Sequence, residues 1–100
     1  MYICFAEYRI APESREAFLA FAKAHLKGRN DVYLYEGTDQ YNLFVEVWQA
    51  GSEEEAERIK KERCDERSLW ARISEWIAGG SAKLHVWTFK PTFTPEGEER

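Results

Sequence analysis

The chain has 100 residues, of which 44% are hydrophobic and 32% are charged. That is the composition of one small globular domain and not of a disordered segment. Its formal net charge of −4 argues against a polyanionic partner such as nucleic acid. There is no apolar run of membrane-spanning length, and Cys4 and Cys64 have the spacing of neither a disulfide framework nor a metal site. We expect a cytoplasmic protein with reduced thiols, no signal peptide and no membrane partner.

Four segments have the aromatic and β-branched composition of strands: 2–10, 31–36, 41–48 and 83–89. A helix is expected between the first two, beginning near Pro12 and ending at Gly28. A second helical pattern begins at Ser52, where Glu55 completes a capping box, and continues to Ala78.

The second helical pattern is too long for the sheet beneath it. A straight helix over 52–78 would measure roughly 40 Å, whereas a strand of nine residues spans about 30 Å. We therefore predict a break within 64–68, where Asp65 can cap a second segment. The apolar stripe that follows begins with Leu69 and Trp70, which we expect to pack on the sheet.

The order β-α-β-β-α-β predicts an α+β fold of the ferredoxin-like type. Its four-stranded antiparallel sheet has the strand order 4-1-3-2, with both helices on one face. Residues 1–91 form one domain in this interpretation, and residues 92–100 form a polar tail.

The two faces of the predicted sheet differ in composition. The first strand presents Cys4, Ala6 and Tyr8 to the helix side. The aliphatic positions of the other strands are assigned to the same side: Val32, Leu34, Leu43, Val45, Val47, Leu84 and Val86. The opposite face then receives Ile3, Phe5, Tyr33, Tyr35, Phe44, Trp48, Trp87 and Phe89. This face also carries Glu7 and Glu46, and the strand register predicts that Glu7 pairs with His85.

An uncovered face with this many aromatic residues exceeds the largest apolar patch of a typical monomer, about 300–600 Å². Two occupants are possible: the same face of a second copy, giving a homodimer with a shared barrel, or stacked bases of an RNA. The acidic charge and the lack of clustered basic residues argue against the nucleic acid. We expect the homodimer.

The element order, the aromatic sheet face and the broken second helix resemble the dimeric α/β-barrel superfamily. They are similar to the antibiotic biosynthesis monooxygenase group, which includes heme-degrading monooxygenases. The nearest local likeness is the first strand, Phe5-Ala6-Glu7-Tyr8-Arg9-Ile10. The resemblance implies a monooxygenase-like enzyme that acts on an apolar aromatic substrate in a pocket between sheet and helices. The alternative is a non-catalytic dimeric ligand-binding or accessory protein of the same fold.

Heme-degrading members of the group use a helix histidine as heme ligand, but no histidine lies between Ser52 and Ser81. We therefore expect no heme, no other cofactor and no metal. The candidate catalytic residues are Tyr8, Trp70 and His25: Tyr8 and Trp70 to orient the substrate and His25 to accept a proton. Each also has a structural interpretation, because Tyr8 and Trp70 suit a core and His25 suits a helix C-terminus.

Overall fold

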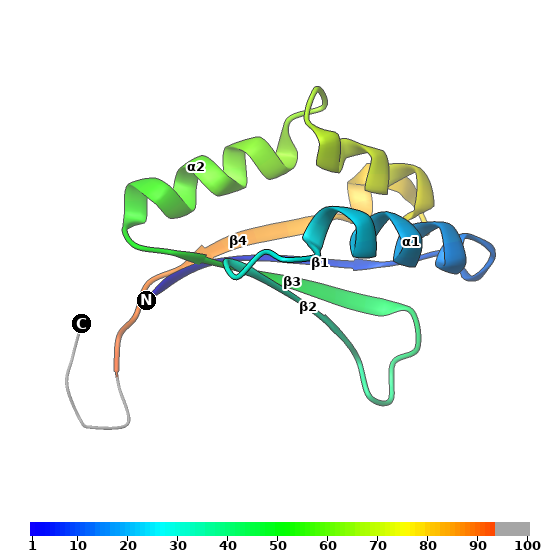
Figure 1. Cartoon of the computed structure of the whole chain (residues 1–100), viewed down its shortest axis with the longest axis horizontal. Coiled ribbons are helices and arrows are strands. Elements are labelled where there is room, and N and C mark those ends of the chain that lie inside the picture. Colours follow the sequence, from blue (N-terminus) through cyan, green and yellow to red (C-terminus); the bar gives the residue numbers. More distant parts are fainter. Residues whose placement is uncertain (94–100) are drawn as a thin grey trace.

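The computed structural model describes residues 1–93 and contains one four-stranded sheet with the order β2-β3-β1-β4 (Figure 1). All strand pairs are antiparallel, which confirms the predicted ferredoxin-like α+β fold. The strands are β1 (Tyr2–Arg9), β2 (Val32–Glu36), β3 (Leu43–Ala50) and β4 (His85–Phe89). Most of the predicted polar tail, residues 94–100, lies outside the described residues.

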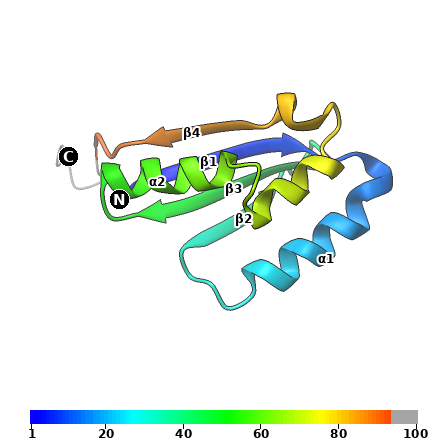
Figure 2. The ribbon, with the colours of Figure 1, turned by 90° about the horizontal axis from the view of Figure 1, so that it is seen from above.

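Two α-helices and three 3-10 segments connect the strands: η1 (Pro12–Ser14), α1 (Arg15–Leu26), α2 (Glu53–Cys64), η2 (Leu69–Trp76) and η3 (Gly80–Lys83). α1, α2 and η2 lie on the same face of the sheet, and the opposite face carries no helix (Figure 1). Seen from above, α2 runs over β1 and β3, whereas α1 lies toward the β2 edge beside η2 (Figure 2). Within residues 1–93, no helix is long and apolar enough to cross a membrane.

The expected break in the second helix is confirmed. α2 ends at Cys64. Asp65 does not cap the second segment as predicted, because η2 begins at Leu69 after Ser68; its carboxylate accepts a hydrogen bond from the backbone N–H of Arg67 at 2.8 Å, within the connecting turn. The chain then continues as η2, so the helical layer bends to follow the sheet instead of overhanging it (Figure 1). At the start of α2, the Ser52 hydroxyl accepts from the N–H of Glu55 at 3.1 Å, as the capping box predicts.

The register between β1 and β4 is also as expected, because Phe5 lies opposite Trp87 and Glu7 lies opposite His85. No ion pair joins Glu7 to His85 in the part of the chain that the structure describes. The His85 ring instead stacks on Trp87, with ring centroids 5.7 Å apart.

The predicted orientation of the third strand is wrong. Phe44, Glu46 and Trp48 lie under the helices, and Leu43, Val45 and Val47 lie on the opposite face. The cause is the register of β3, because residues opposite each other in a ladder share a face, and Phe44 lies opposite Tyr8. A shift of one residue moves every side chain of a strand to the other face.

The helix-free surface of the sheet is called the open face below. It consists of Ile3, Phe5, Glu7, Arg9, Tyr33, Tyr35, Leu43, Val45, Val47, Gln49, His85, Trp87 and Phe89. Its outer aromatic residues are about half exposed, with Trp87 at 45% and Phe89 at 49%. The open face is therefore still largely apolar, although Phe44 and Trp48 do not contribute to it.

Candidate ligand-binding site

The carboxylate of Glu46 lies on the covered face of β3, where Glu46 is only 2% exposed. It accepts hydrogen bonds from the Tyr8 hydroxyl and from the indole Nε1 of Trp48, the latter at 2.8 Å. Arg63 donates two more, from Nε to Oε1 and from Nη2 to Oε2, each at 2.8 Å. The buried negative charge is thus held by three side chains from β1, β3 and α2.

Arg63 reaches this carboxylate because of its position on α2. It follows Ala56 by seven positions and Ile59 by four, the spacing that places residues on one face of a helix. Burial of Arg63 lowers its pKa, but the hydrogen bonds and charge of Glu46 outweigh that effect and raise the pKa. The guanidinium and carboxylate therefore form a charged pair inside the core.

One nitrogen of the Arg63 guanidinium, Nη1, takes no part in these hydrogen bonds. Arg63 Nη1 is buried and has no hydrogen-bond partner among residues 1–93. Buried N–H groups usually have an acceptor, because leaving one without costs about 1–3 kcal/mol. Less than 1 Å² of Nη1 is accessible, so a molecule in a neighbouring cavity does not reach this N–H in the structure.

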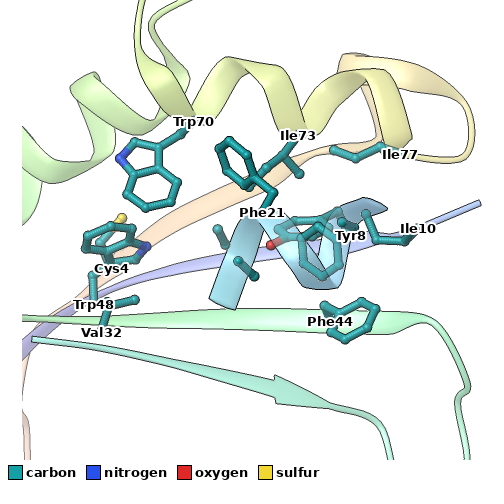
Figure 3. Packing of buried hydrophobic residues seen from close by; sticks show 13 residues of the cluster. Cys4, Tyr8, Ile10, Phe21, Val32, Phe44, Trp48, Trp70, Ile73 and Ile77 are labelled. Atoms are coloured by element: carbon teal, nitrogen blue, oxygen red, sulfur yellow. The ribbon is translucent and has the colours of Figure 1, made fainter. Parts of the chain in front are cut away.

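A small cavity of ≈ 120 Å³ adjoins Arg63. Its walls come from α2, β3, η2 and the segment before β2: Arg29, Asp31, Trp48, Glu55, Ile59, Glu62, Arg63 and Trp70. The rings of Trp48 and Trp70 meet edge to face, with centroids 5.2 Å apart and an interplanar angle of 81° (Figure 3). We refer to this cavity as the tryptophan pocket.

The outer part of the tryptophan pocket is charged. Arg29 pairs with Asp31 at 2.7 Å, and this hydrogen-bonded pair holds the pKa of the Asp31 carboxyl below its usual range. The Arg29 guanidinium also lies 5.2 Å from the ring centroid of Trp48. Glu55 and Glu62 of α2 complete this outer part.

Tyr8, a predicted catalytic residue, does not line the tryptophan pocket. Tyr8 lies in the buried hydrophobic cluster and is 2% exposed (Figure 3). Its ring packs edge to face on Phe18, and its hydroxyl donates to Glu46. Burial, followed by the charge and hydrogen bond of Glu46, raises the pKa of Tyr8 well above its usual value. The hydroxyl is thus already occupied within the core.

The other two predicted site residues lie near each other. The ring centroids of His25 and Trp70 are 6.4 Å apart, and the Phe21 ring lies tilted against His25, with centroids 4.4 Å apart and an interplanar angle of 48°. Only Trp70 of the three predicted residues lines the tryptophan pocket. The structure therefore brings Trp70 and His25 together, and it places the Tyr8 hydroxyl in the separate Glu46 cluster.

The pocket was expected above Cys4 and Ala6, where small side chains leave space in the covered face. Both residues have no exposed surface, and they belong to one core cluster with Phe18 and Phe21. Burial raises the pKa of the Cys4 thiol to about 11, with smaller contributions from Cys64 and Glu46. The observed cavity lies at the α2 end of the covered face instead.

Sequence reasoning missed Glu46, Trp48 and Arg63 as site residues. The spacing of Arg63 relative to Ala56 and Ile59 is the signal that could have identified them. An arginine on the buried face of a helix requires a carboxylate partner, and Glu46 is the one charged residue among the inward positions of β3.

Another depression, a wide groove of ≈ 510 Å³, lies between α1 and β2. Leucine and valine side chains form most of it, and its polar groups are the exposed Lys23 and Lys27. It has no buried polar group to orient a ligand, unlike the tryptophan pocket. Within residues 1–93, no group of three or more His, Cys, Asp or Glu residues has a metal-binding arrangement.

The fold is similar to that of protein Atu4242 from Agrobacterium tumefaciens in two crystal structures. Both match with a TM-score of 0.56 and 21% identity over 95% of this chain, and the matches cover 98% and 92% of the Atu4242 chain. One structure describes Atu4242 as a nipsnap family protein with unknown function. No protein-family model and no curated protein matches the sequence. At this identity the likeness to Atu4242 supports the fold alone.

Proposed function

We propose that this chain is a homodimeric small-molecule-binding protein whose ligand occupies the tryptophan pocket. The observation that carries the proposal is the cavity itself, in which the indole rings of Trp48 and Trp70 lie beside charged side chains of α2 and of the segment before β2. Aromatic side chains together with a few polar groups that fix orientation are common in small-molecule sites.

The size of the pocket limits its ligand. An engineered cavity of about 150 Å³ in another protein binds benzene, and the tryptophan pocket of ≈ 120 Å³ is of that order. The ligand is therefore an aromatic molecule of about one ring, with part of it extending toward the charged outer residues.

The dimer in this proposal rests on the open face. Its apolar side chains come from all four strands, and Trp87, Phe89, Tyr33 and Tyr35 each keep roughly half of their surface exposed. A patch of this kind on a monomer marks an interaction surface. The same face of a second copy supplies a matching apolar surface, and an obligate dimer of this type buries more than about 1,500 Å².

The monooxygenase activity that the resemblance implies stays a prediction. Atu4242 is itself a protein described as having unknown function. The geometry favours the binding interpretation, because the Tyr8 hydroxyl donates to Glu46 and does not reach the tryptophan pocket. Trp70 and His25 remain candidate residues for contact with a ligand.

Filling the pocket tests the proposal. Ile59→Trp adds a large side chain at the cavity wall without removing any hydrogen bond, whereas Leu69→Trp adds the same side chain at an exposed position outside the cavity. We expect small aromatic amides and ketones to raise the Tm of the wild type and of Leu69→Trp but not of Ile59→Trp. If all three proteins respond alike, or none responds at millimolar ligand, the pocket is not the binding site.

A further inference from the structure

The wide groove between α1 and β2 is lined mainly by aliphatic side chains: Leu19, Ala22, Leu26, Val32 and Leu34, with Tyr33 and two lysines completing the wall. Ala22 and Val32 are buried members of the core, so packed residues form part of this wall. The volume of ≈ 510 Å³ falls in the range of about 300–1,000 Å³ that is usual for ligand sites. The groove shares no lining residue with the tryptophan pocket. We refer to it as the lysine groove, after Lys23 and Lys27.

The lysine groove follows α1 over about two turns. Its α1 side runs from Leu19 through Lys23 to Lys27, in steps of four positions. The N–H of Lys27 donates to the carbonyl of Lys23 at 3.2 Å, so the helical path continues as far as Lys27. At a rise of 1.5 Å per residue, these positions span about 12 Å. With C–C bonds of about 1.5 Å in a zigzag, an extended alkyl chain of about ten carbon atoms has the same length.

Both charged residues of the lysine groove are positive. The chain is acidic overall, with 18 acidic and 14 basic residues, yet no carboxylate lines this groove. Lys23 and Lys27 are exposed, and neither takes part in an ion pair among residues 1–93. Like charges one helical turn apart repel each other, and an anion between them removes that repulsion. The end of a helix favours lysine, but that preference does not account for the aliphatic wall beside these two.

We propose that the lysine groove binds a free fatty acid with an unbranched chain of about ten carbon atoms. The chain lies along the aliphatic wall toward Leu19, and the carboxylate lies at the rim between Lys23 and Lys27. Such a ligand needs no buried polar partner, because its charged end stays at the surface and only its methylene groups leave water. The inference goes beyond the proposed function, since it concerns a second site with a different class of ligand.

Decanoate and decyltrimethylammonium test the headgroup, because they share one chain and carry opposite charges. Calorimetric titration of the whole chain, below the critical micelle concentration of either ligand, should show decanoate binding about tenfold more tightly. Two exposed ion pairs that each contribute a factor of about three give this ratio. Equal or reversed affinities would overturn the assignment of the carboxylate to the lysines.

The alkyl chain is tested by its length. A methylene group that leaves water completely raises the affinity about fourfold, and one covered on a single side raises it about twofold. Decanoate should therefore bind about fourfold more tightly than octanoate, and the gain per methylene should fall beyond about ten carbons. An affinity that does not depend on chain length would contradict the role of the aliphatic wall and overturn the proposal.

The double variant Lys23→Gln with Lys27→Gln locates the site. It should lose the preference for decanoate over decyltrimethylammonium. The double variant Lys61→Gln with Lys90→Gln removes the same charge from exposed positions outside the groove and should keep the preference. All four lysines are exposed, so both variants should fold, which circular dichroism checks. If the first variant keeps the preference, the carboxylate does not bind at the lysine groove.

Vesicles of equimolar phosphatidylcholine and phosphatidylglycerol test a membrane surface as the source of the same chemistry. The chain should not sediment with them, and sedimentation without decanoate binding would replace the free fatty acid by a membrane. Ile59→Trp, which fills the tryptophan pocket, should bind decanoate like the wild type, and a loss there would assign the ligand to that pocket. If decanoate does not bind the wild type, this inference fails, whereas the response of the tryptophan pocket to aromatic amides remains a separate result.

Discussion

The two faces of the sheet depart in opposite ways from the usual distribution of charged and apolar side chains. The covered face buries a carboxylate and a guanidinium, Glu46 and Arg63, each 2% exposed. The open face carries aromatic and aliphatic side chains with no helix over them, and Trp87 remains 45% exposed. Buried charges are normally rare and exposed apolar patches are normally small.

The difference indicates that the two faces meet different occupants. A second apolar sheet can cover the open face without any polar group to orient it. Helices already pack on the covered face, and Arg63 Nη1 is buried there without an acceptor among residues 1–93. In our proposal, self-association therefore belongs to the open face, and recognition of a small molecule belongs to the covered face.

Removal of Arg63 should have the largest effect. Arg63→Ala leaves the Glu46 carboxylate buried without its counter-ion, which should cost about 3–5 kcal/mol of unfolding free energy. Urea denaturation at one fixed protein concentration measures this. Arg58→Ala, at an exposed position of the same helix, should stay within about 0.5 kcal/mol of the wild type.

Replacement of the whole pair sharpens that result. The double variant Glu46→Leu with Arg63→Met removes both charges and should recover most of the lost stability, since apolar replacements of buried pairs are often neutral. A double variant as unstable as Arg63→Ala would show that the hydrogen bonds of Tyr8 and Trp48 to Glu46 contribute more than the ion pair.

A charge on the open face should abolish the dimer. Trp87→Glu places a carboxylate in the proposed interface, whereas Leu69→Glu places one at a residue of similar exposure on the helix side. Light scattering at micromolar concentration should give twice the chain mass for the wild type and Leu69→Glu and a single chain mass for Trp87→Glu. A monomeric wild type would contradict the assignment of the open face to self-association.

The fold could be predicted from the sequence because element order and turn residues determine it. Composition alone indicated that β1 is central, and its faces were predicted correctly. For β3, however, both sets of alternating residues are mainly apolar, so periodicity does not distinguish its faces. The aliphatic set was assigned to the helix side, which left Glu46 on the opposite face. The burial of Glu46 depends on Arg63, which lies seventeen positions further along the chain.

The candidate site was less predictable for the same reason. Trp70 could be found from the apolar stripe after the helix break, and it does line the pocket. Trp48 and Arg63 could not be placed there without the orientation of β3 and the burial of one face of a highly charged helix. Sites that depend on pairing between distant elements are the ones that local patterns do not reveal.

Tyr8→Phe should have an intermediate effect on the free energy of unfolding. It distinguishes a structural role of Tyr8, as a hydrogen-bond donor to Glu46, from a role in contacting a ligand. The variant removes only the hydroxyl that donates to the Glu46 carboxylate. Because the acceptor is charged, the expected loss of unfolding free energy is about 1.5–3 kcal/mol. Benzamide affinity should stay unchanged, since Tyr8 does not line the tryptophan pocket. A large loss of affinity without a loss of stability would restore Tyr8 as a site residue.

The smallest effect is expected at the two cysteine thiols. Their reactivity measures how well the covered face is shielded from solvent. Cys4 has no exposed surface, whereas Cys64 at the end of α2 is exposed. Burial raises the pKa of the Cys4 thiol from 9.0 to about 11, so the folded chain keeps this proton after the unfolded chain has lost it. The contribution of Cys4 to stability is therefore complete below pH 9 and is lost as the pH rises toward 11.

Mass spectrometry after iodoacetamide at pH 8 to 9 should find Cys64 alkylated and Cys4 intact. Cys4→Ala should flatten the fall in stability at alkaline pH, and equal labelling of both thiols would show that the covered face opens readily.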